Sequence, residues 1–295
     1  MKTTAANSGP GRLFLVSTPI GNLEDISLRA LRILKEADLI ACEDTRQTRK
    51  LLSHFDIRTR LESYHEHNEL TRAPELVIDL ERGAKIALVS DAGTPIISDP
   101  GHHLVTLCHR HGIPVVPVPG ASALVAALAV SGMDTGEFVF AGFLPARQSA
   151  RRKELRRLAV EPRTLVFYEA PHRLVDTLED ALEILGNRGA VVAREVTKLH
   201  EEFIRGRISQ LLESFCERAP RGEITLVIGA ADAAAHPRGE GASTPAANLV
   251  NRIEEIMRER GIDQKVALKQ AARECGLTRR EAYKQWLVSR TDNSN

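Results

Sequence analysis

Short apolar runs alternate along the first half of the chain with segments whose apolar residues recur at helical spacing. The runs cover residues 13–16, 39–42, 86–89 and 115–118, and residues 28–36 form a helical segment that Ser27 is expected to cap. Strands that alternate with helices are typical of βαβ units, in which the strands lie parallel and the helices cover the sheet. The pattern therefore predicts an α/β fold with a parallel sheet in the first half.

The second half repeats this alternation. Strand-like runs are found at residues 138–141, 165–168, 190–193 and 224–228, and helical segments at 151–158, 172–185 and 208–217. Residues 230–247 are rich in Ala, Pro, Gly and Ser and have no periodicity, which is typical of a flexible linker. We therefore expect a disordered tail at 1–11, α/β domains at 12–133 and 134–230, a linker at 231–247 and a helical module at 248–290.

Charge and cysteine content argue against several classes of protein. The 295 residues carry a net charge of +1, so any nucleic-acid surface must be a local patch. The four cysteines lie far apart without CxxC spacing, which argues against a zinc site or a disulfide framework and favours the cytoplasm. We expect neither an export signal nor a membrane span. The GxGxxG, GxxxxGK[ST], HExxH and GxSxG motifs are missing from the sequence.

The segment 90–101, SDAGTPIISDPG, follows an apolar run and precedes a helical pattern. At the carboxyl end of a parallel strand, Gly93 lets a ligand approach the backbone, and Thr94 and Asp91 offer hydrogen-bonding groups. Asp99, which precedes Pro100, is expected to accept a hydrogen bond or to cap the next helix. The alternative is an ordinary turn, because Gly, Pro, Ser and Asp are common turn residues.

Four histidines and a cysteine gather in the helical segment that follows this loop, namely His102, His103, Cys108, His109 and His111. Adjacent histidines point to different sides of a helix, and no carboxylate pattern completes a ligand set. We therefore assign no metal site.

Six segments in order carry a family resemblance: STPIGNLED at 17–25, CEDTR at 42–46, SDAGTPIISDPG at 90–101, PGASA at 119–123, YEAPHR at 168–173 and REVTK at 194–198. Together they resemble the ribosomal RNA small subunit methyltransferase I family, a branch of the tetrapyrrole methylase superfamily. The resemblance extends from about residue 12 to the C-terminal helices. Asp91 lies between Ser90 and Ala92, whereas the wider superfamily has a Gly-Asp-Pro pattern, and this departure favours an RNA substrate.

The resemblance implies an enzyme that uses S-adenosylmethionine to methylate the ribose 2′-oxygen of a cytidine, position 1402, in the decoding region of 16S rRNA. It also implies two α/β domains with the methyl donor in the cleft between them, a homodimer, and the small ribosomal subunit as partner. The residues that it assigns to the donor pocket are Pro19, Asp91, Ala92, Gly93, Thr94, Ile96, Ser122, Ala123 and Tyr168.

Methyl transfer to a ribose hydroxyl calls for a general base or for a cation that stabilises the developing alkoxide. The candidates, at or just after strand ends of the second domain, are Glu169, His172, Glu195 and Lys198. Each has an alternative role in a salt bridge or a helix cap. The same alternatives apply to Glu43, Asp44 and Arg46 after the second strand.

The densest basic run suggests where RNA binds. We assign to this surface Arg147, Arg151, Arg152, Lys153 and Arg156, together with Arg173 from the YEAPHR segment. A basic patch beside the cleft would contact phosphates and position the RNA without reading its sequence. The alternative is a solvated helix face.

Residues 264–287 have the proportions of a helix-turn-helix. Arg279, Arg280 and Lys284 suit a phosphate surface, and a small core is expected from Val266, Ala267, Ala271, Ala282 and Trp286. We expect this module to assist rRNA docking. Two other functions remain open, a methyltransferase acting on a small tetrapyrrole and a DNA-binding regulator that senses a ligand.

Overall fold

The computed structural model describes residues 11–218 and 220–230, together with Ile253, Ile256, Asp263, residues 266–268 and Ala271. The chain divides into two compact units, 1–231 and 232–295. The expected linker and most of the expected tail and helical module lie outside the described residues. Gly11, which we had assigned to the tail, is buried next to the first strand.

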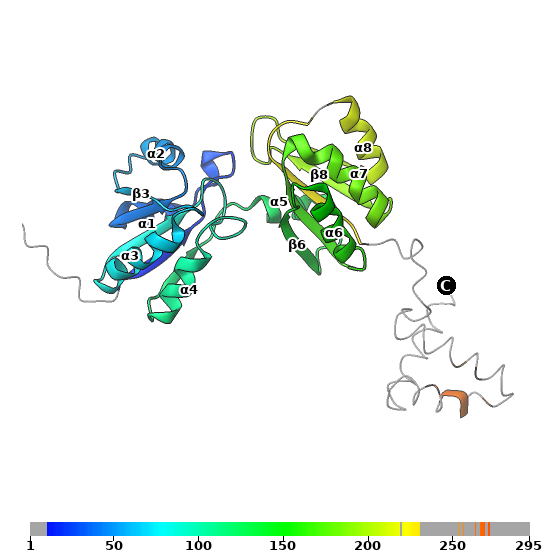
Figure 1. Cartoon of the computed structure of the whole chain (residues 1–295), viewed down its shortest axis with the longest axis horizontal. Coiled ribbons are helices and arrows are strands. Elements are labelled where there is room, and N and C mark those ends of the chain that lie inside the picture. Colours follow the sequence, from blue (N-terminus) through cyan, green and yellow to red (C-terminus); the bar gives the residue numbers. More distant parts are fainter. Residues whose placement is uncertain are drawn as a thin grey trace, which may run out of the picture. The chain divides into compact units, whose positions relative to one another are not determined.

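The first sheet lies among the blue and cyan elements of Figure 1. It is fully parallel, with the strand order β3-β2-β4-β1-β5. Its strands are β1 (Arg12–Val16), β2 (Leu39–Cys42), β3 (Leu61–Ser63), β4 (Lys85–Val89) and β5 (Val115–Val118). Loops that follow parallel strands gather at one edge of such a sheet, where ligands bind in many α/β proteins. The expected parallel sheet is confirmed.

Helices cover both faces of this sheet. One face packs against α1 (Leu28–Glu36) and α2 (Thr45–His54), and the other against α3 (Glu69–Glu81) and α4 (His102–Arg110). The Ser27 side chain accepts a hydrogen bond from the Ala30 N–H at 3.1 Å, so it caps α1 as the sequence predicts. Gly101, rather than Asp99, occupies the cap position of α4, so the expected cap at Asp99 is wrong.

The second sheet is mixed, with the order β6-β7-β10-β8-β9. Its strands are β6 (Phe138–Phe143), β7 (Thr164–Glu169), β8 (Gly189–Arg194), β9 (Glu202–Arg207) and β10 (Ile224–Ile228). One face packs against α6 (Gln148–Leu158), α7 (Leu174–Leu185) and α8 (Ile208–Glu217). The described chain also contains two 3-10 turns, η1 (Leu23–Asp25) and η2 (Pro171–Arg173). The α/β class is confirmed for both sheets.

The other face of the second sheet is covered by α5 (Ala123–Ser131), which follows the last strand of the first sheet. Ala127 and Leu128 pack there with Val166 of β7 and Val227 of β10, and Ile20 from the loop after β1 joins the same cluster. The packing boundary therefore falls before α5, although the sequence suggested a boundary at residue 133. This shared core ties the loop after β1 to the second sheet.

In the C-terminal unit, Ala267 and Ala271 are buried, as expected for a small core. Val266 is 53% exposed, so its assignment to that core is wrong. Ala282, Trp286, Arg279, Arg280 and Lys284 lie outside the described residues. Among the helices described, none has the length and apolar character needed to cross a membrane.

Candidate functional site

A cavity of about 380 Å³ lies among loops that the sequence analysis singled out. Its walls come from the loops after β1, β4, β5, β7 and β8, from the ends of β6 and β7, and from the segment that precedes and begins β10. The lining residues are Ile20, Asp91, Ala92, Gly93, Thr94, Ile97, Ser98, Asp99, Ser122, Ala123, Phe143, Tyr168, Glu169, Ala170, Pro171, Val196, Glu223, Ile224 and Thr225. Both sheets therefore contribute to one pocket, with a size typical of small-molecule sites.

The loop after β4 is fixed to the loop after β1. The backbone N–H of Thr18 donates to the Gly93 carbonyl at 2.9 Å, and the Gly93 N–H donates to the Thr18 carbonyl at 3.1 Å. The Thr94 hydroxyl lies 3.0 Å from that of Ser17 and 3.4 Å from the Ala121 carbonyl. Thr94 therefore connects three loops, and the hydroxyl that it is expected to offer to a ligand also contacts Ser17 and Ala121.

Seven of the nine residues assigned to the donor pocket line the cavity: Asp91, Ala92, Gly93, Thr94, Ser122, Ala123 and Tyr168. The other two, Pro19 and Ile96, are replaced in the lining by their neighbours Ile20 and Ile97. Ile96 has a φ of 77° and packs against the core between the first sheet and α3 and α4. Its left-handed backbone turns the Ile96 side chain inward and leaves Ile97 at the cavity.

Asp99 faces the cavity and is half-buried. Burial and the nearby Glu43 carboxylate raise the pKa of Asp99 to about 6, against a smaller opposing effect of the hydrogen bond from Ser90. The sequence predicts Asp99 as a hydrogen-bond acceptor or helix cap in this loop, but not as one of the donor-pocket residues. One feature of the sequence argues against a cap at Asp99. Pro100 and Gly101 lie between Asp99 and His102, the first residue of α4, whereas a cap residue directly precedes its helix.

Aromatic rings form part of the opposite wall. Phe143 at the end of β6 and Tyr168 on β7 have ring centroids 5.6 Å apart, and Phe140 packs edge-on to Tyr168 at 5.0 Å. Burial raises the pKa of Tyr168, and Asp99 raises it further, while hydrogen bonds at Leu124 and Ser122 lower it. Phe143 is a lining residue that sequence reasoning missed, because an apolar residue at a strand end is indistinguishable there from a core residue.

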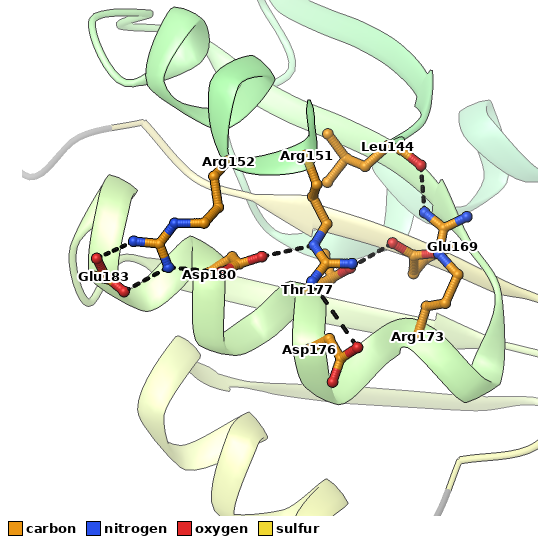
Figure 2. Close-up of polar contacts among 9 residues, drawn as sticks. All are labelled: Leu144, Arg151, Arg152, Glu169, Arg173, Asp176, Thr177, Asp180 and Glu183. Atoms are coloured by element: carbon orange, nitrogen blue, oxygen red, sulfur yellow. Dashed lines mark hydrogen bonds and ion pairs between the residues drawn. The ribbon is translucent and has the colours of Figure 1, made fainter. Parts of the chain in front are cut away.

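Glu169 is 2% exposed, and both of its carboxylate oxygens are bonded (Figure 2). Oε1 accepts the Ala170 N–H at 2.8 Å and lies 3.2 Å from Nε of Arg173, while Oε2 accepts the Thr177 hydroxyl at 2.7 Å. A carboxylate with this set of partners holds the loop after β7 in place. This geometry argues against Glu169 as a proton acceptor.

Glu195 and Lys198 form a second ion-paired group at the cavity edge. Lys198 Nζ lies 2.9 Å from Oε1 of Glu195 and 3.2 Å from Oε2 of Glu223, which lines the cavity. Burial raises the pKa of Glu195, but the hydrogen bonds from Lys198 and from the Glu223 N–H outweigh it and lower the pKa overall. Burial lowers the pKa of Lys198, and its two carboxylate partners outweigh that effect and raise it. Neither group is suited to accept a proton at neutral pH.

His172 is exposed on η2, next to the lining residue Pro171, and its own side chain is not part of the cavity wall. Asp44 caps α2 and also donates its backbone N–H to Asp91 Oδ1 at 3.0 Å. Arg46 pairs with Asp44 at 2.7 Å. The segment after β2 thus supports the loop that carries Asp91.

Half of the basic residues assigned to RNA binding are engaged inside the protein (Figure 2). Arg151 is 2% exposed and its Nε donates to Asp180 at 2.7 Å. Arg152 pairs with Asp180 at 2.9 Å and with Glu183. Arg173 donates to the Leu144 carbonyl and pairs with Glu169, as described above.

The acids that neutralise the basic run come from α7. Asp176, Asp180 and Glu183 lie on one face of that helix, at spacings of four and three residues. This spacing is visible in the sequence and could have indicated an acidic helix face that pairs with the basic run. Assigning Arg151, Arg152 and Arg173 to a phosphate surface is therefore corrected. Three exposed residues remain, namely Arg147, Lys153 and Arg156, none of which forms an ion pair with another described residue.

Another cavity, of about 450 Å³, is lined partly by Arg194, Glu202 and Arg218. Arg194 and Arg218 both approach Glu202, at 2.7 and 3.9 Å. Among the residues that line this cavity, only Arg194 belongs to the six segments that carry the family resemblance. The cavity at the loop after β4 is therefore the candidate site.

The chain is similar to known proteins over most of its length. Residues 12–212 match the family model of tetrapyrrole (corrin/porphyrin) methylases. Ribosomal RNA small subunit methyltransferase I of Halalkalibacterium halodurans is 48% identical, over 92% of this chain and 93% of its own. The protein of the same name from Thermotoga maritima is 52% identical, over 74% of this chain and 98% of its own.

Solved structures share the fold at low sequence identity. Uroporphyrin-III C-methyltransferase from Thermus thermophilus, complexed with S-adenyl homocysteine, has a TM-score of 0.55 at 23% identity and covers 74% of this chain and 97% of its own. A diphthine synthase has a TM-score of 0.57 at 14% identity and covers 74% of this chain and 90% of its own. The chain therefore belongs to the tetrapyrrole methylase family and, within it, to the ribosomal RNA small subunit methyltransferase I family.

Proposed function

We propose that this protein transfers a methyl group from S-adenosylmethionine to the ribose 2′-oxygen of a cytidine, position 1402, in 16S rRNA. The observation that carries the proposal is the cavity at the loop after β4, which gathers seven of the nine residues that the family resemblance assigned to the donor. Relatives that cover more than nine-tenths of the chain bear a name that states an rRNA substrate.

The residues of the cavity fit a donor that is cationic at one end and aromatic at the other. Asp91 offers an exposed carboxylate that pairs with no cation among the described residues. Ile20, Ala123 and Val196 supply an apolar surface. Opposite charge and apolar contact are the two kinds of recognition that this donor needs.

Bound S-adenosylmethionine supplies a sulfonium methyl group, which a ribose oxygen attacks in line. The work of the chain is to hold the ribose in that line, to exclude water and to accept the proton. Phe143 and Tyr168 provide a wall for the target nucleoside. Glu195 and Lys198 hold Glu223 at the cavity edge. We assign to Glu223 a role in positioning the ribose. His172 stays a catalytic candidate predicted from the sequence, although its side chain does not line the cavity.

For RNA binding we propose three exposed residues spread along α6: Arg147 at its N-terminus, Lys153 in its middle and Arg156 in its last turn. Cations at this position would contact phosphates and set the register of the RNA. A ribosomal substrate also implies a cytoplasmic enzyme. A homodimer, the assembly expected from the resemblance, is part of the proposal.

The test uses the full-length protein with tritiated S-adenosylmethionine and small ribosomal subunits that lack modifications. We expect label in 16S rRNA, located by nuclease mapping to a decoding-region cytidine. Alkali should leave the adjacent linkage uncut, because alkaline cleavage needs a free 2′-hydroxyl. Subunits already methylated at that ribose are the matched control and should accept no label.

The same assay separates the alternatives. Label on a base rather than a ribose would contradict the proposed acceptor atom. Absence of label on RNA while the donor binds, together with a spectral change on addition of a porphyrin, would favour a tetrapyrrole substrate. Protection of a promoter would favour a DNA-binding regulator.

A further inference from the structure

The ribose hydroxyl needs a proton acceptor, and four carboxylates line the cavity: Asp91, Asp99, Glu169 and Glu223. Glu169 has both oxygens bonded, and Glu223 is paired with Lys198 at 3.2 Å. Asp91 is exposed, accepts the Asp44 N–H at 3.0 Å, and is assigned above to recognition of the donor. Asp99 is the remaining carboxylate of the described lining.

The backbone around Asp99 is unusual. Ile96 and Ser98 have positive φ values of 77° and 68°, and Gly101 has a φ of 133°. A non-glycine residue with positive φ costs free energy, of the order of 1 kcal/mol, and such residues cluster at functional sites. Ile96 and Ser98 both precede Asp99 and Gly101 follows it, and Asp99 lies at the cavity rather than at the cap position of α4.

The end of β6 in the second sheet lies close to the same turn. Gly142 has a φ of 61°, and a Cβ built there would lie 3.2 Å from the Ser98 hydroxyl oxygen. This close approach brings the turn next to the irregular end of β6, where the register shifts between Phe140 and Phe143. Asp99 is therefore presented from the first-domain loop toward the aromatic wall that carries Phe143 and Tyr168.

The groups around Asp99 come from three elements. Glu43 follows β2, Asp91 and Ser90 share the loop after β4, and Tyr168 belongs to β7. Burial and Glu43 raise the pKa of Asp99 to about 6, Ser90 opposes this by hydrogen bonding, and Asp91 adds to it. A base with a pKa near the working pH, yet ionised there, is efficient in general base catalysis.

We propose that the Asp99 carboxylate is the general base that accepts the proton of the ribose 2′-hydroxyl. This inference rests on the proposed function. The ribose oxygen forms a new bond to the methyl carbon as the carbon–sulfur bond breaks, sulfur keeps the electron pair, and the proton goes to Asp99. Product release then returns Asp99 to solvent, where it loses the proton above its pKa.

The test compares wild type, Asp99→Asn and Asp99→Ala in single-turnover methylation of unmodified small subunits between pH 5 and pH 9. We expect the wild-type rate to fall about tenfold per pH unit below about pH 6, because the base is then protonated. Asp99→Asn should be slower by about 10²–10⁴-fold and should lose this dependence. Formate, a small external base, should partly restore Asp99→Ala. Donor affinity measured by calorimetry should change little, which also shows that the variants fold.

Asp79→Asn makes the same chemical change on the exposed surface of α3 and should behave like wild type. A wild-type rate in Asp99→Asn would overturn the inference while the proposed function stands. Loss of donor affinity equal to the loss of rate would also overturn it, because Asp99 would then bind the donor. If wild type itself labels no RNA, the proposed function fails, and that failure is seen without any variant.

Discussion

The two walls of the cavity treat their carboxylates differently. In the first-domain wall, Asp91 and Asp99 have no cationic partner among the described residues. In the second-domain wall, Glu169 pairs with Arg173, and Glu223 pairs with Lys198. The first wall therefore carries negative charge that is not neutralised locally, whereas the second wall is neutralised within itself.

The difference separates a reactive surface from a scaffold. Unpaired carboxylates attract a cationic ligand and can exchange protons, at a cost in stability. Ion-paired carboxylates keep loops in place, and a separate buried bridge, Arg151–Asp180, joins α6 to α7 on the helix-covered face of the second sheet. Substitutions in the first wall should change binding and rate, and substitutions in the second should change stability.

The largest effect is expected from Asp180→Ala. Arg151 and Asp180 are each 2% exposed, so removal of the acid leaves a buried guanidinium with only a distant partner, Asp176 at 4.0 Å. Breaking such a pair from one side costs about 3–5 kcal/mol. Urea denaturation should show this as a lower midpoint.

Asp176→Ala is the matched control, because the Asp176 side chain is 66% exposed. It should cost less than about 1 kcal/mol. Equal losses from the two variants would mean that burial of the pair does not stabilise the second wall as described.

The next effect concerns the first wall. Asp91→Asn removes the charge of a lining carboxylate while keeping its shape, so we expect donor affinity to fall about tenfold, with the free energy of unfolding nearly unchanged. Calorimetric titration with S-adenosylmethionine measures the affinity. Loss of stability without loss of donor affinity would contradict this assignment, because Asp91 would then stabilise the fold rather than bind the donor.

A smaller effect distinguishes two arginines of α6. Arg156→Glu should weaken RNA binding and lower the slope of log affinity against log salt by about one, because Arg156 is exposed. Arg152→Glu should instead destabilise the fold, because it places a third acid beside Asp180 and Glu183. Filter binding at several salt concentrations and thermal melts separate the outcomes. Equal RNA binding by wild type and Arg156→Glu would exclude this face of α6.

The smallest effect is a pH dependence at Asp44. Hydrogen bonds from Arg46 lower the pKa of Asp44 to about 2, and this stabilisation is present above the pKa of the unfolded chain and is lost as the pH falls through about 2. Thermal melts of wild type and Asp44→Asn should therefore differ near pH 5 and converge near pH 2. A constant difference would show that the carboxylate charge is not involved.

The sequence identifies the buried strands well, because they are short apolar runs between turn residues. It does not identify β3 (Leu61–Ser63) or β9 (Glu202–Arg207). Both lie at sheet edges, are only partly buried and carry charged residues, so their pattern differs little from a loop. Edge strands depend on a neighbouring strand that local sequence does not reveal.

Site prediction succeeds where function depends on the backbone of one loop. The loop around Gly93 could be located from the sequence, because its strand-loop-helix context determines where it lies. The assignment of Arg151 and Arg152 to an RNA-binding surface is wrong, because their ion-pair partners are supplied by another helix, α7. Side-chain roles that depend on packing between helices need the tertiary structure.

The position of β1 inside the first sheet has a consequence for biosynthesis. Arg12 pairs with Lys85 and Leu13 with Val115, so the first strand leaves the ribosome about seventy residues before one neighbour and about a hundred before the other. At synthesis rates of about 5–20 residues per second, β1 therefore has no neighbouring strand for several seconds, and its apolar side chains stay exposed during that time. The nascent chain is therefore expected to need shielding by a chaperone until β5 emerges, and folding should be limited by this distant pairing.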